Sequence, residues 1–228
     1  MTRTTASGLT HPVAPRSGPP VLLVHGAGTT ARLWDRVRAE LRDLPVVAPD
    51  RRSSGDLAAE VADLAPWAEG ALVVGVSGGA TLGLALASSE VRLAGAILHE
   101  PAVGGLLPGL LAPVAAAFAA HGVAGFGRTL YGPLWSPEMA PDDPGAVERD
   151  LAMFRAFEPS APRRGQGPVL VTVGAQSPPA RFQAAGALEE AFGLTHRVVE
   201  GCAHFVPIEA PLTLARLVVS VRRELSGG

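Results

Sequence analysis

The sequence of 228 residues contains a single cysteine, no lysine and no asparagine. Because Cys202 has no partner, no disulfide can form within the chain, which is compatible with a reducing cytoplasm. The missing lysine excludes Schiff-base catalysis, a Walker A nucleotide loop and a Ser-x-x-Lys dyad. The missing asparagine excludes a Cys-His-Asn triad and N-linked glycosylation. Any nucleophilic catalysis therefore uses other residues.

Charge is also scarce. Charged residues make up 18% of the chain and the net charge is −2, which argues against a nucleic-acid partner. Residues 1–18 contain no apolar run of signal-peptide length, so we expect a cytoplasmic protein. Between Pro101 and Gly127 there is no Asp, Glu, Lys or Arg, a length sufficient for a membrane span. Three prolines and six glycines interrupt this stretch, so we expect broken, apolar helices and no membrane span.

Apolar residues make up 47% of the chain, enough for a sizeable core, and their spacing alternates along the sequence. Short apolar runs predict buried strands at 21–24, 45–48, 71–76, 93–98, 168–173 and 195–199. Helical spacing predicts helices over 31–43, 56–65, 79–89 and 180–192 and a last helix through Leu225. This alternation indicates an α/β fold, a mostly parallel sheet covered by helices on both faces. It stops over 102–166, where only helical segments broken by Pro and Gly are expected.

The strand at 71–76 ends in the sequence Gly75-Val76-Ser77-Gly78-Gly79. A serine on a sharp turn between a strand and a helix is held clear of the sheet, and small neighbours let the backbone bend. The N–H of Gly78, at the start of the helix, can stabilise an oxyanion. The alternative is a glycine-rich turn that serves packing alone. We predict that Ser77 is a nucleophile.

Two further loops follow strands. In His25-Gly26-Ala27-Gly28 the glycines let backbone N–H groups point into a cleft, and Ala27 is the best second oxyanion donor. We expect His25 to be structural rather than catalytic. His204 lies in the loop after the last strand and can act as general base on Ser77. Cys202 is a rival nucleophile, although a buried, inert cysteine is the default.

Together these motifs, with Pro49-Asp50-Arg51-Arg52 and the late Gly-x-x-His, resemble the α/β-hydrolase superfamily over about 20–100 and 168–225. Trp34 also resembles a position that many small bacterial members fill with Trp. The resemblance implies an eight-stranded sheet with a helical cap inserted after the sixth strand. It thus implies a core of 1–100 and 167–228 and a cap or lid of 101–166. The N-terminal sheet edge is expected to be shortened, with the first two family strands short, fused or missing.

The family usually carries its triad acid after the seventh strand, but no Asp or Glu occurs between Glu158 and Glu189. Three alternatives stay open. Glu100 follows the sixth family strand, a position that some branches use, including part of the haloalkane dehalogenase group. Asp50 follows the fourth and is more often structural, pairing with a nearby Arg. The third alternative is a Ser–His dyad without a carboxylate. We favour Glu100.

The resulting interpretation is a cytoplasmic serine hydrolase for a small-molecule ester, thioester or lactone with an apolar acyl or aromatic group. The resemblance and the motifs assign the catalytic residues Ser77, His204 and Glu100, the oxyanion donors Ala27 and Gly78, and the pocket residues His25, Trp34, Phe118 and Phe126. No cofactor is implied, and the six histidines show no zinc spacing. The alternatives are a non-hydrolytic enzyme of the same fold (a cofactor-free lyase, cyclase or perhydrolase) and a non-catalytic ligand-binding protein.

Overall fold

Short runs of valine and leucine form the sheet at the centre of the molecule. The computed structural model describes residues 18–227, in which six parallel strands lie in the order β2-β1-β3-β4-β5-β6. The strands are β1 (Val21–Val24), β2 (Val46–Val47), β3 (Leu72–Val76), β4 (Gly95–His99), β5 (Val169–Gly174) and β6 (His196–Val199). Every residue of β1, β3 and β4 is buried, as expected for parallel strands covered on both faces.

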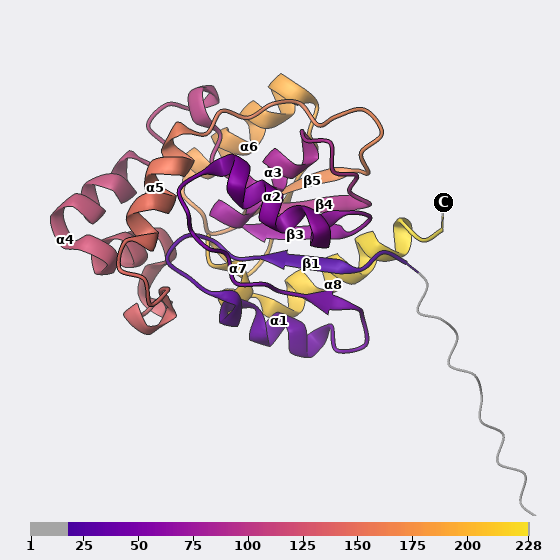
Figure 1. Cartoon of the computed structure of the whole chain (residues 1–228), viewed down its shortest axis with the longest axis horizontal. Coiled ribbons are helices and arrows are strands. Elements are labelled where there is room, and N and C mark those ends of the chain that lie inside the picture. The colour runs from indigo at the N-terminus through magenta and orange to yellow at the C-terminus, as the bar shows by residue number, and fades with distance from the viewer. Residues whose placement is uncertain (1–17, 228) are drawn as a thin grey trace, which may run out of the picture.

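Helices cover both faces of the sheet, as predicted (Figure 1). On one face α1 packs against α8, and on the other α2 packs against α3, with α6 on the same side. The bounds are α1 (Asp35–Glu40), α2 (Leu57–Ala68), α3 (Gly78–Ala87), α6 (Pro179–Phe192), α7 (Val206–Glu209) and α8 (Pro211–Glu224), with a 3-10 helix at Ala31–Trp34 before α1. The core therefore lies in two layers, one on each side of the sheet.

The strand order reverses between β1 and β3. From β1 the chain continues to β2 on one side, whereas from β3 it continues to β4 on the other side. In open parallel sheets such a reversal leaves a crevice at the carboxyl ends of the strands. The loop His25–Gly28 and Ser77 both lie at this crevice because they follow β1 and β3 directly.

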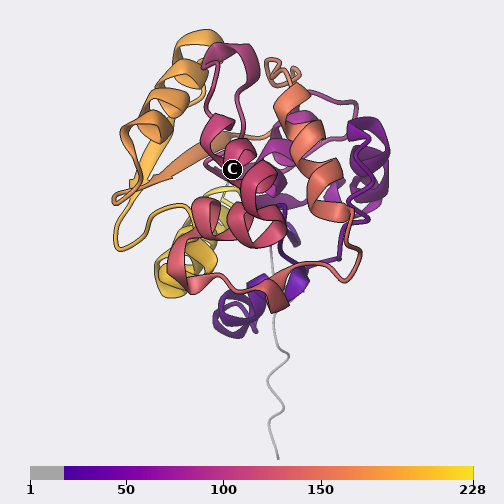
Figure 2. The ribbon, with the colours of Figure 1, turned by 90° about the vertical axis from the view of Figure 1, so that its left-hand side faces the viewer.

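The segment 101–166, here called the cap, joins β4 to β5 and is helical without a strand, as predicted. Its main helices are α4 (Ala112–Tyr131) and α5 (Ala146–Ala156), with 3-10 turns at Gly104–Leu106, Gly132–Leu134 and Pro137–Met139. Figures 1 and 2 show α4 and α5 across the carboxyl ends of the strands. Gly122, with φ 59°, kinks α4. No helix within residues 18–227 is long and apolar enough to cross a membrane.

The two sheet edges differ from the sequence prediction. The strand expected at 45–48 is only two residues long and half-buried, and three of the four residues of β6 are exposed. Both strands have a neighbour on one side only, so they are less covered than the central strands. No strand precedes β1 within the described part of the chain, and residues 1–17, which would hold the first two family strands, lie outside it.

Candidate active site

Ser77 occupies the turn between β3 and α3. Its φ of 54° and ψ of −121° form a strained conformation for a residue with a side chain. A Cβ at Gly75 would lie 2.4 Å from the carbonyl oxygen of Gly79, and one at Gly79 would lie 2.0 Å from that of Val24. Both positions therefore require glycine, because the backbone passes too close for a side chain. The turn presents Ser77 at the crevice, where the residue remains 9% exposed.

His204 and Glu100 form a hydrogen-bonded pair at the same end of the sheet. His204 follows β6, Glu100 follows β4, and Nδ1 of the imidazole lies 2.7 Å from Oε2 of the carboxylate. Oε1 accepts hydrogen bonds from the N–H of Gly174, at 2.9 Å, and from the hydroxyl of Ser177. Gly174 is the last residue of β5, and Ser177 belongs to the loop after β5, where the family usually carries an acid. In this chain that loop donates to Glu100 instead.

The pair is buried, and its surroundings set its charge. Burial would raise the pKa of Glu100, but the hydrogen bond from His204 and the nearby charge of Arg181 hold it below its ordinary value. Burial and the charge of Arg181 lower the pKa of His204 to about 4, although Glu100 acts in the opposite direction. At neutral pH a neutral imidazole therefore lies beside an ionised carboxylate.

The carboxylate also decides which nitrogen of His204 carries the proton. Because Glu100 can only accept, Nδ1 donates to it and the lone pair resides on Nε2. Nε2 is buried and has no hydrogen-bond partner among residues 18–227. A hydroxyl group that turns towards Nε2 can transfer its proton to this nitrogen. Hydrogen bonds between a catalytic base and its partner are often long in the absence of substrate.

Two neighbours hold the loop that carries His204. Nε2 of His99 lies 3.0 Å from the carbonyl oxygen of Ala203 and donates to it. The carboxylate of Glu209 accepts from the N–H groups of Ala203 and Phe205, at 2.8 Å and 3.1 Å. The backbone is therefore fixed on both sides of His204.

The carbonyl of Gly26 orients the loop after β1. It accepts hydrogen bonds from Nδ1 of His25 at 2.9 Å, from the hydroxyl of Thr29 at 3.0 Å and from Arg51 at 3.3 Å. The N–H of Ala27 belongs to the same planar peptide and points the opposite way, so these bonds also fix its direction.

The N–H groups of Ala27 and Gly78 are free to receive a negative oxygen. Neither donates a hydrogen bond to another residue in the described chain. Both residues line the small cavity beside Ser77. Gly78 is the first residue of α3, where the helix dipole further stabilises a negative charge. The two expected oxyanion donors therefore lie around one space.

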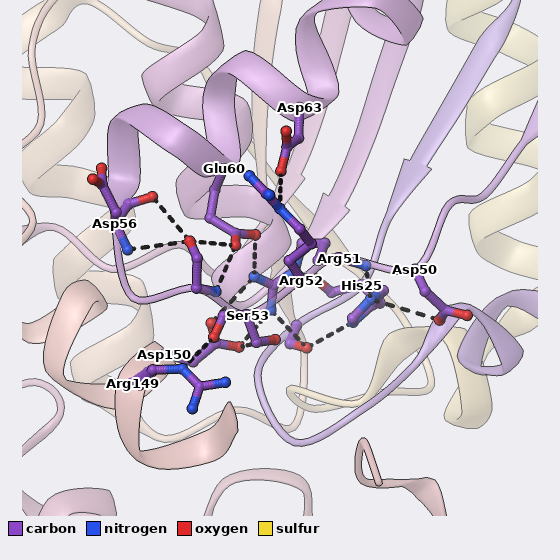
Figure 3. A network of polar contacts seen from close by, with 12 residues as sticks. His25, Asp50, Arg51, Arg52, Ser53, Asp56, Glu60, Asp63, Arg149 and Asp150 are labelled. Carbon is purple, nitrogen blue, oxygen red and sulfur yellow. Dashed lines mark hydrogen bonds and ion pairs between the residues drawn. The ribbon is translucent and has the colours of Figure 1, made fainter. Parts of the chain in front are cut away.

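Arg51 is the centre of a buried polar network (Figure 3). Its guanidinium lies 2.6 Å from Asp150 of α5 and 3.1 Å from Glu60 of α2, and all three side chains are at most 2% exposed. Nε donates to the carbonyl of His25 at 3.1 Å, and the hydroxyl of Ser53 donates to Asp150. One buried cation therefore connects the cap, α2 and the loop His25–Gly28.

The cavity beside Ser77 has a volume of about 20 Å³ and mostly apolar walls. Its lining consists of Ala27, Ser77, Gly78, Thr81, Ala102, Leu111, Val114, Phe126, Leu130, Leu151 and Phe154. A groove of about 280 Å³ adjoins it, and the two share Ala102, Leu111 and Phe154. The small cavity therefore adjoins an open groove whose lining residues all belong to the cap.

Of the four residues expected to line the pocket, one lines the small cavity beside Ser77. Phe126 lines the cavity, whereas Phe118 packs edge-on against Phe126 and is not among the lining residues. Trp34 is fully buried in the core. His25 is 1% exposed, and burial and Arg51 lower its pKa to about 3, so it remains a neutral structural residue. These three side chains are occupied by packing or by backbone hydrogen bonds.

Two rival assignments lose support. Burial, followed by the charge of Glu209, raises the pKa of the Cys202 thiol to about 12, so a thiolate is disfavoured. The side chain of Asp50 is 69% exposed and accepts from the N–H of Ala31 at 2.6 Å, not from the expected arginine. Within residues 18–227 no three His, Cys, Asp or Glu side chains gather as metal ligands would.

Sequence reasoning missed four residues. Ser177 and Arg181 contact Glu100, and Asp150 contacts Arg51. The fourth is Tyr131 of the cap. Tyr131 stacks on the ring of His204 and donates to the carbonyl of Ala27. Its place at the end of a mostly apolar helix carries no local signal. Ser177 lies in the loop that lacks the usual acid, and this absence was the one available signal for it.

The comparisons with known proteins identify the family and the fold. A sequence model of the alpha/beta hydrolase family matches residues 21–217. A search of curated proteins finds no significant match.

Solved structures share the fold at low identity. An enol-lactonase from Burkholderia xenovorans LB400 is 19% identical with a TM-score of 0.69, over 89% of this chain and 90% of that chain. A lipase-esterase related protein from Clostridium acetobutylicum is 12% identical with a TM-score of 0.71, over 90% and 95%. A carboxylesterase from Bacillus subtilis is 18% identical with a TM-score of 0.64, over 94% and 86%. The sharp turn at Ser77 between β3 and α3, here called the elbow, the parallel sheet and the family match lead to one conclusion: this chain belongs to the alpha/beta hydrolase family.

Proposed function

We propose that this protein is a serine hydrolase that cleaves an ester, thioester or lactone through an acyl-enzyme intermediate. The observation that carries the proposal is the 2.7 Å contact between His204 Nδ1 and Glu100, at the same end of the sheet as the strained turn of Ser77. This contact supports Glu100 over Asp50 and over a dyad as the acid. The similar structures include an enol-lactonase and a carboxylesterase, which supports hydrolysis of a carbonyl substrate.

The proposed reaction has two halves. Ser77 Oγ attacks the carbonyl carbon while Nε2 of His204 takes the hydroxyl proton. Glu100 holds the imidazole and stabilises the imidazolium that forms. The N–H groups of Ala27 and Gly78 bind the oxyanion, and the collapse of the intermediate releases the alcohol or thiol, which receives the proton from His204. Water, activated by His204, then attacks the acyl-enzyme and releases the acid and Ser77.

The cavity supports an apolar group next to the scissile carbonyl. Its volume of about 20 Å³ is enough for about one water-sized group, so a group no larger than a methyl fits there without movement. A longer chain or an aromatic ring reaches the groove when Leu111 and Phe154, at the boundary, move apart. The cap carries Leu111 and Phe154, and in this proposal it acts as a lid over the substrate.

The test is hydrolysis of p-nitrophenyl esters of graded acyl length by the wild-type protein and by Ser77→Ala. We expect turnover that depends on acyl length in the wild type and none above background in the variant. The melting temperature should change little, because alanine keeps the backbone strain and removes only one hydroxyl. Ser160→Ala, at an exposed position outside the site, is the matched control.

Two results contradict the proposal. Turnover by Ser77→Ala close to that of the wild type would exclude Ser77 as the nucleophile. A wild-type protein that binds the esters without releasing p-nitrophenol, and that a fluorophosphonate probe does not label, would favour the non-catalytic alternative. Labelling of the wild type but not of Ser77→Ala supports the assignment.

A further inference from the structure

Tyr131 brings the cap into contact with the catalytic residues. It is the last residue of α4, it is 3% exposed, and it lies more than fifty residues from Ser77 in the sequence. Its two ends contact different parts of the site. The hydroxyl contacts the loop His25–Gly28, here called the oxyanion loop, and the ring contacts the imidazole of His204.

The hydroxyl lies between the oxyanion loop and the nucleophile. It donates to the carbonyl oxygen of Ala27 at 2.7 Å. A Cβ at Gly26 would lie 2.4 Å from Tyr131 Oη and 3.1 Å from Ser77 Cβ, so the phenol and Ser77 flank the same backbone atom. Glycine at position 26 therefore makes room for a hydroxyl supplied by the cap.

Two sets of hydrogen bonds thus hold the peptides on either side of the Ala27 Cα. The peptide before it is held by the donors to the Gly26 carbonyl, all of which come from the core. The peptide after it is held by Tyr131, which comes from the cap. With both planes fixed, the φ and ψ angles of Ala27 are fixed as well, and so is the direction of the N–H proposed to bind the oxyanion.

The ring acts on the second catalytic group. Tyr131 and His204 stack with ring centroids 5.5 Å apart and planes inclined by 29°. On the other side the phenol packs against Phe205, at 4.6 Å. The ring therefore contributes to the burial of the imidazole, and burial is the main cause that lowers the pKa of His204 to about 4.

We propose that Tyr131 is a positioning residue through which the cap aligns both the oxyanion loop and His204 for the reaction. This inference rests on the proposed hydrolase function. The hydroxyl and the ring have separable roles: the hydroxyl orients the Ala27 peptide, and the ring shields the imidazole from water. Burial raises the pKa of Tyr131 above its ordinary value, so the phenol remains a neutral donor throughout the working range of the enzyme.

The two roles can be separated by substitution. Tyr131→Phe keeps the ring over His204 and removes the donor to Ala27. We expect kcat to fall about 10-fold, less than the 10²–10³-fold typical for loss of a direct oxyanion donor. KM and the acidic limb of the pH profile of kcat/KM should be unchanged. Tyr131→Leu removes the ring as well, so the acidic limb should move from about pH 4 towards the ordinary histidine value of about 6.5.

Two controls accompany these variants. Val123→Ala truncates a half-buried residue of the same helix, so a general disturbance of α4 would appear there too. Trp135→Phe removes the indole N–H that donates to the Gly28 carbonyl at 2.8 Å. It disturbs the next peptide of the loop without a ring contact to His204, so it should leave the acidic limb in place.

The outcomes are distinct. Tyr131→Phe with wild-type kcat overturns the role of the hydroxyl, and folded Tyr131→Leu with an unshifted limb overturns the role of the ring. If Tyr131→Leu does not fold, the comparison of Tyr131→Phe with Val123→Ala still decides the first point. A wild-type enzyme whose turnover does not require Ser77 would contradict the proposed function itself, which is a different result from either of these.

Discussion

Glu100→Gln is the sharpest test of the proposed catalytic machinery. The carboxylate receives three donors: the N–H of Gly174 and the hydroxyl of Ser177 on one oxygen, and Nδ1–H of His204 on the other. Glutamine offers one accepting oxygen and one NH₂ group. We expect the oxygen to stay with Gly174 and Ser177, where it serves two donors. The NH₂ group, which is a donor, then faces Nδ1 of His204. Because Nδ1 must then accept a hydrogen bond, the imidazole carries its proton on Nε2 instead.

A protonated Nε2 cannot take the proton from Ser77, so the loss should be large. In serine proteases the corresponding Asp-to-Asn change costs on the order of 10⁴-fold in kcat. We therefore expect a fall of at least about 10²-fold, which corresponds to ~2.7 kcal/mol of transition-state stabilisation at 1.36 kcal/mol per tenfold. KM should change little, because Glu100 is not among the residues that line the cavity.

The assay is the steady-state hydrolysis of a p-nitrophenyl ester, with circular dichroism and the melting temperature as checks of folding. Glu69→Gln is the matched control, since Glu69 is exposed and, within residues 18–227, accepts a hydrogen bond only from the N–H of Arg92. A folded Glu100→Gln protein whose kcat lies within a few-fold of the wild type would refute the reasoning. The dyad would then be the better description of the site.

The remaining predictions concern stability. Arg51→Met leaves Asp150 and Glu60 buried without their cation and should lower the free energy of unfolding by about 3–5 kcal/mol, measured by urea denaturation. Arg52→Met, which breaks an exposed pair with Asp63, should cost less than about 1 kcal/mol, and equal losses would contradict the assignment. Stability should also fall as the pH drops from about 6.5 towards 4. In the folded protein the pKa values of His204 and His25 are about 4 and about 3, so over this pH range only the unfolded chain binds protons at these two histidines. A free energy of unfolding that stays constant over this range would contradict the burial of both histidines as neutral groups.

Much of the fold could be predicted from local patterns. The central strands follow from runs of apolar residues that are buried on both faces, as in β1 and β3. The elbow follows from the glycines around Ser77, because the close backbone approach at Gly75 and Gly79 permits no side chain. The edges were predicted less well. The run 45–48 is apolar like a central strand, and its place at the edge of the sheet leaves it short and half-buried.

The contact between His204 and Glu100 could also be expected from sequence. Carboxyl ends of parallel strands meet at one edge, and the loop after β5 has no carboxylate of its own, so few candidates remained. The sequence did not indicate the donors of that loop or the nearby Arg181. Their positions depend on how α6 packs against β5 and β6, which no local spacing records.

The pocket and the support of the oxyanion loop were decided by tertiary structure alone. His25 was expected near the substrate as part of the loop after β1, and Trp34 was expected there because it resembles a family position. Both are buried, and neither lines the cavity. From about a hundred residues away, Tyr131 reaches this loop directly, and Asp150 reaches Arg51, which donates to the loop. The sequence by itself determined the sheet, the elbow and the catalytic candidates, because glycine requirements and apolar periodicity are local. Only the tertiary structure decided which cap side chains close the site, because such contacts depend on the docking of one folded segment on another.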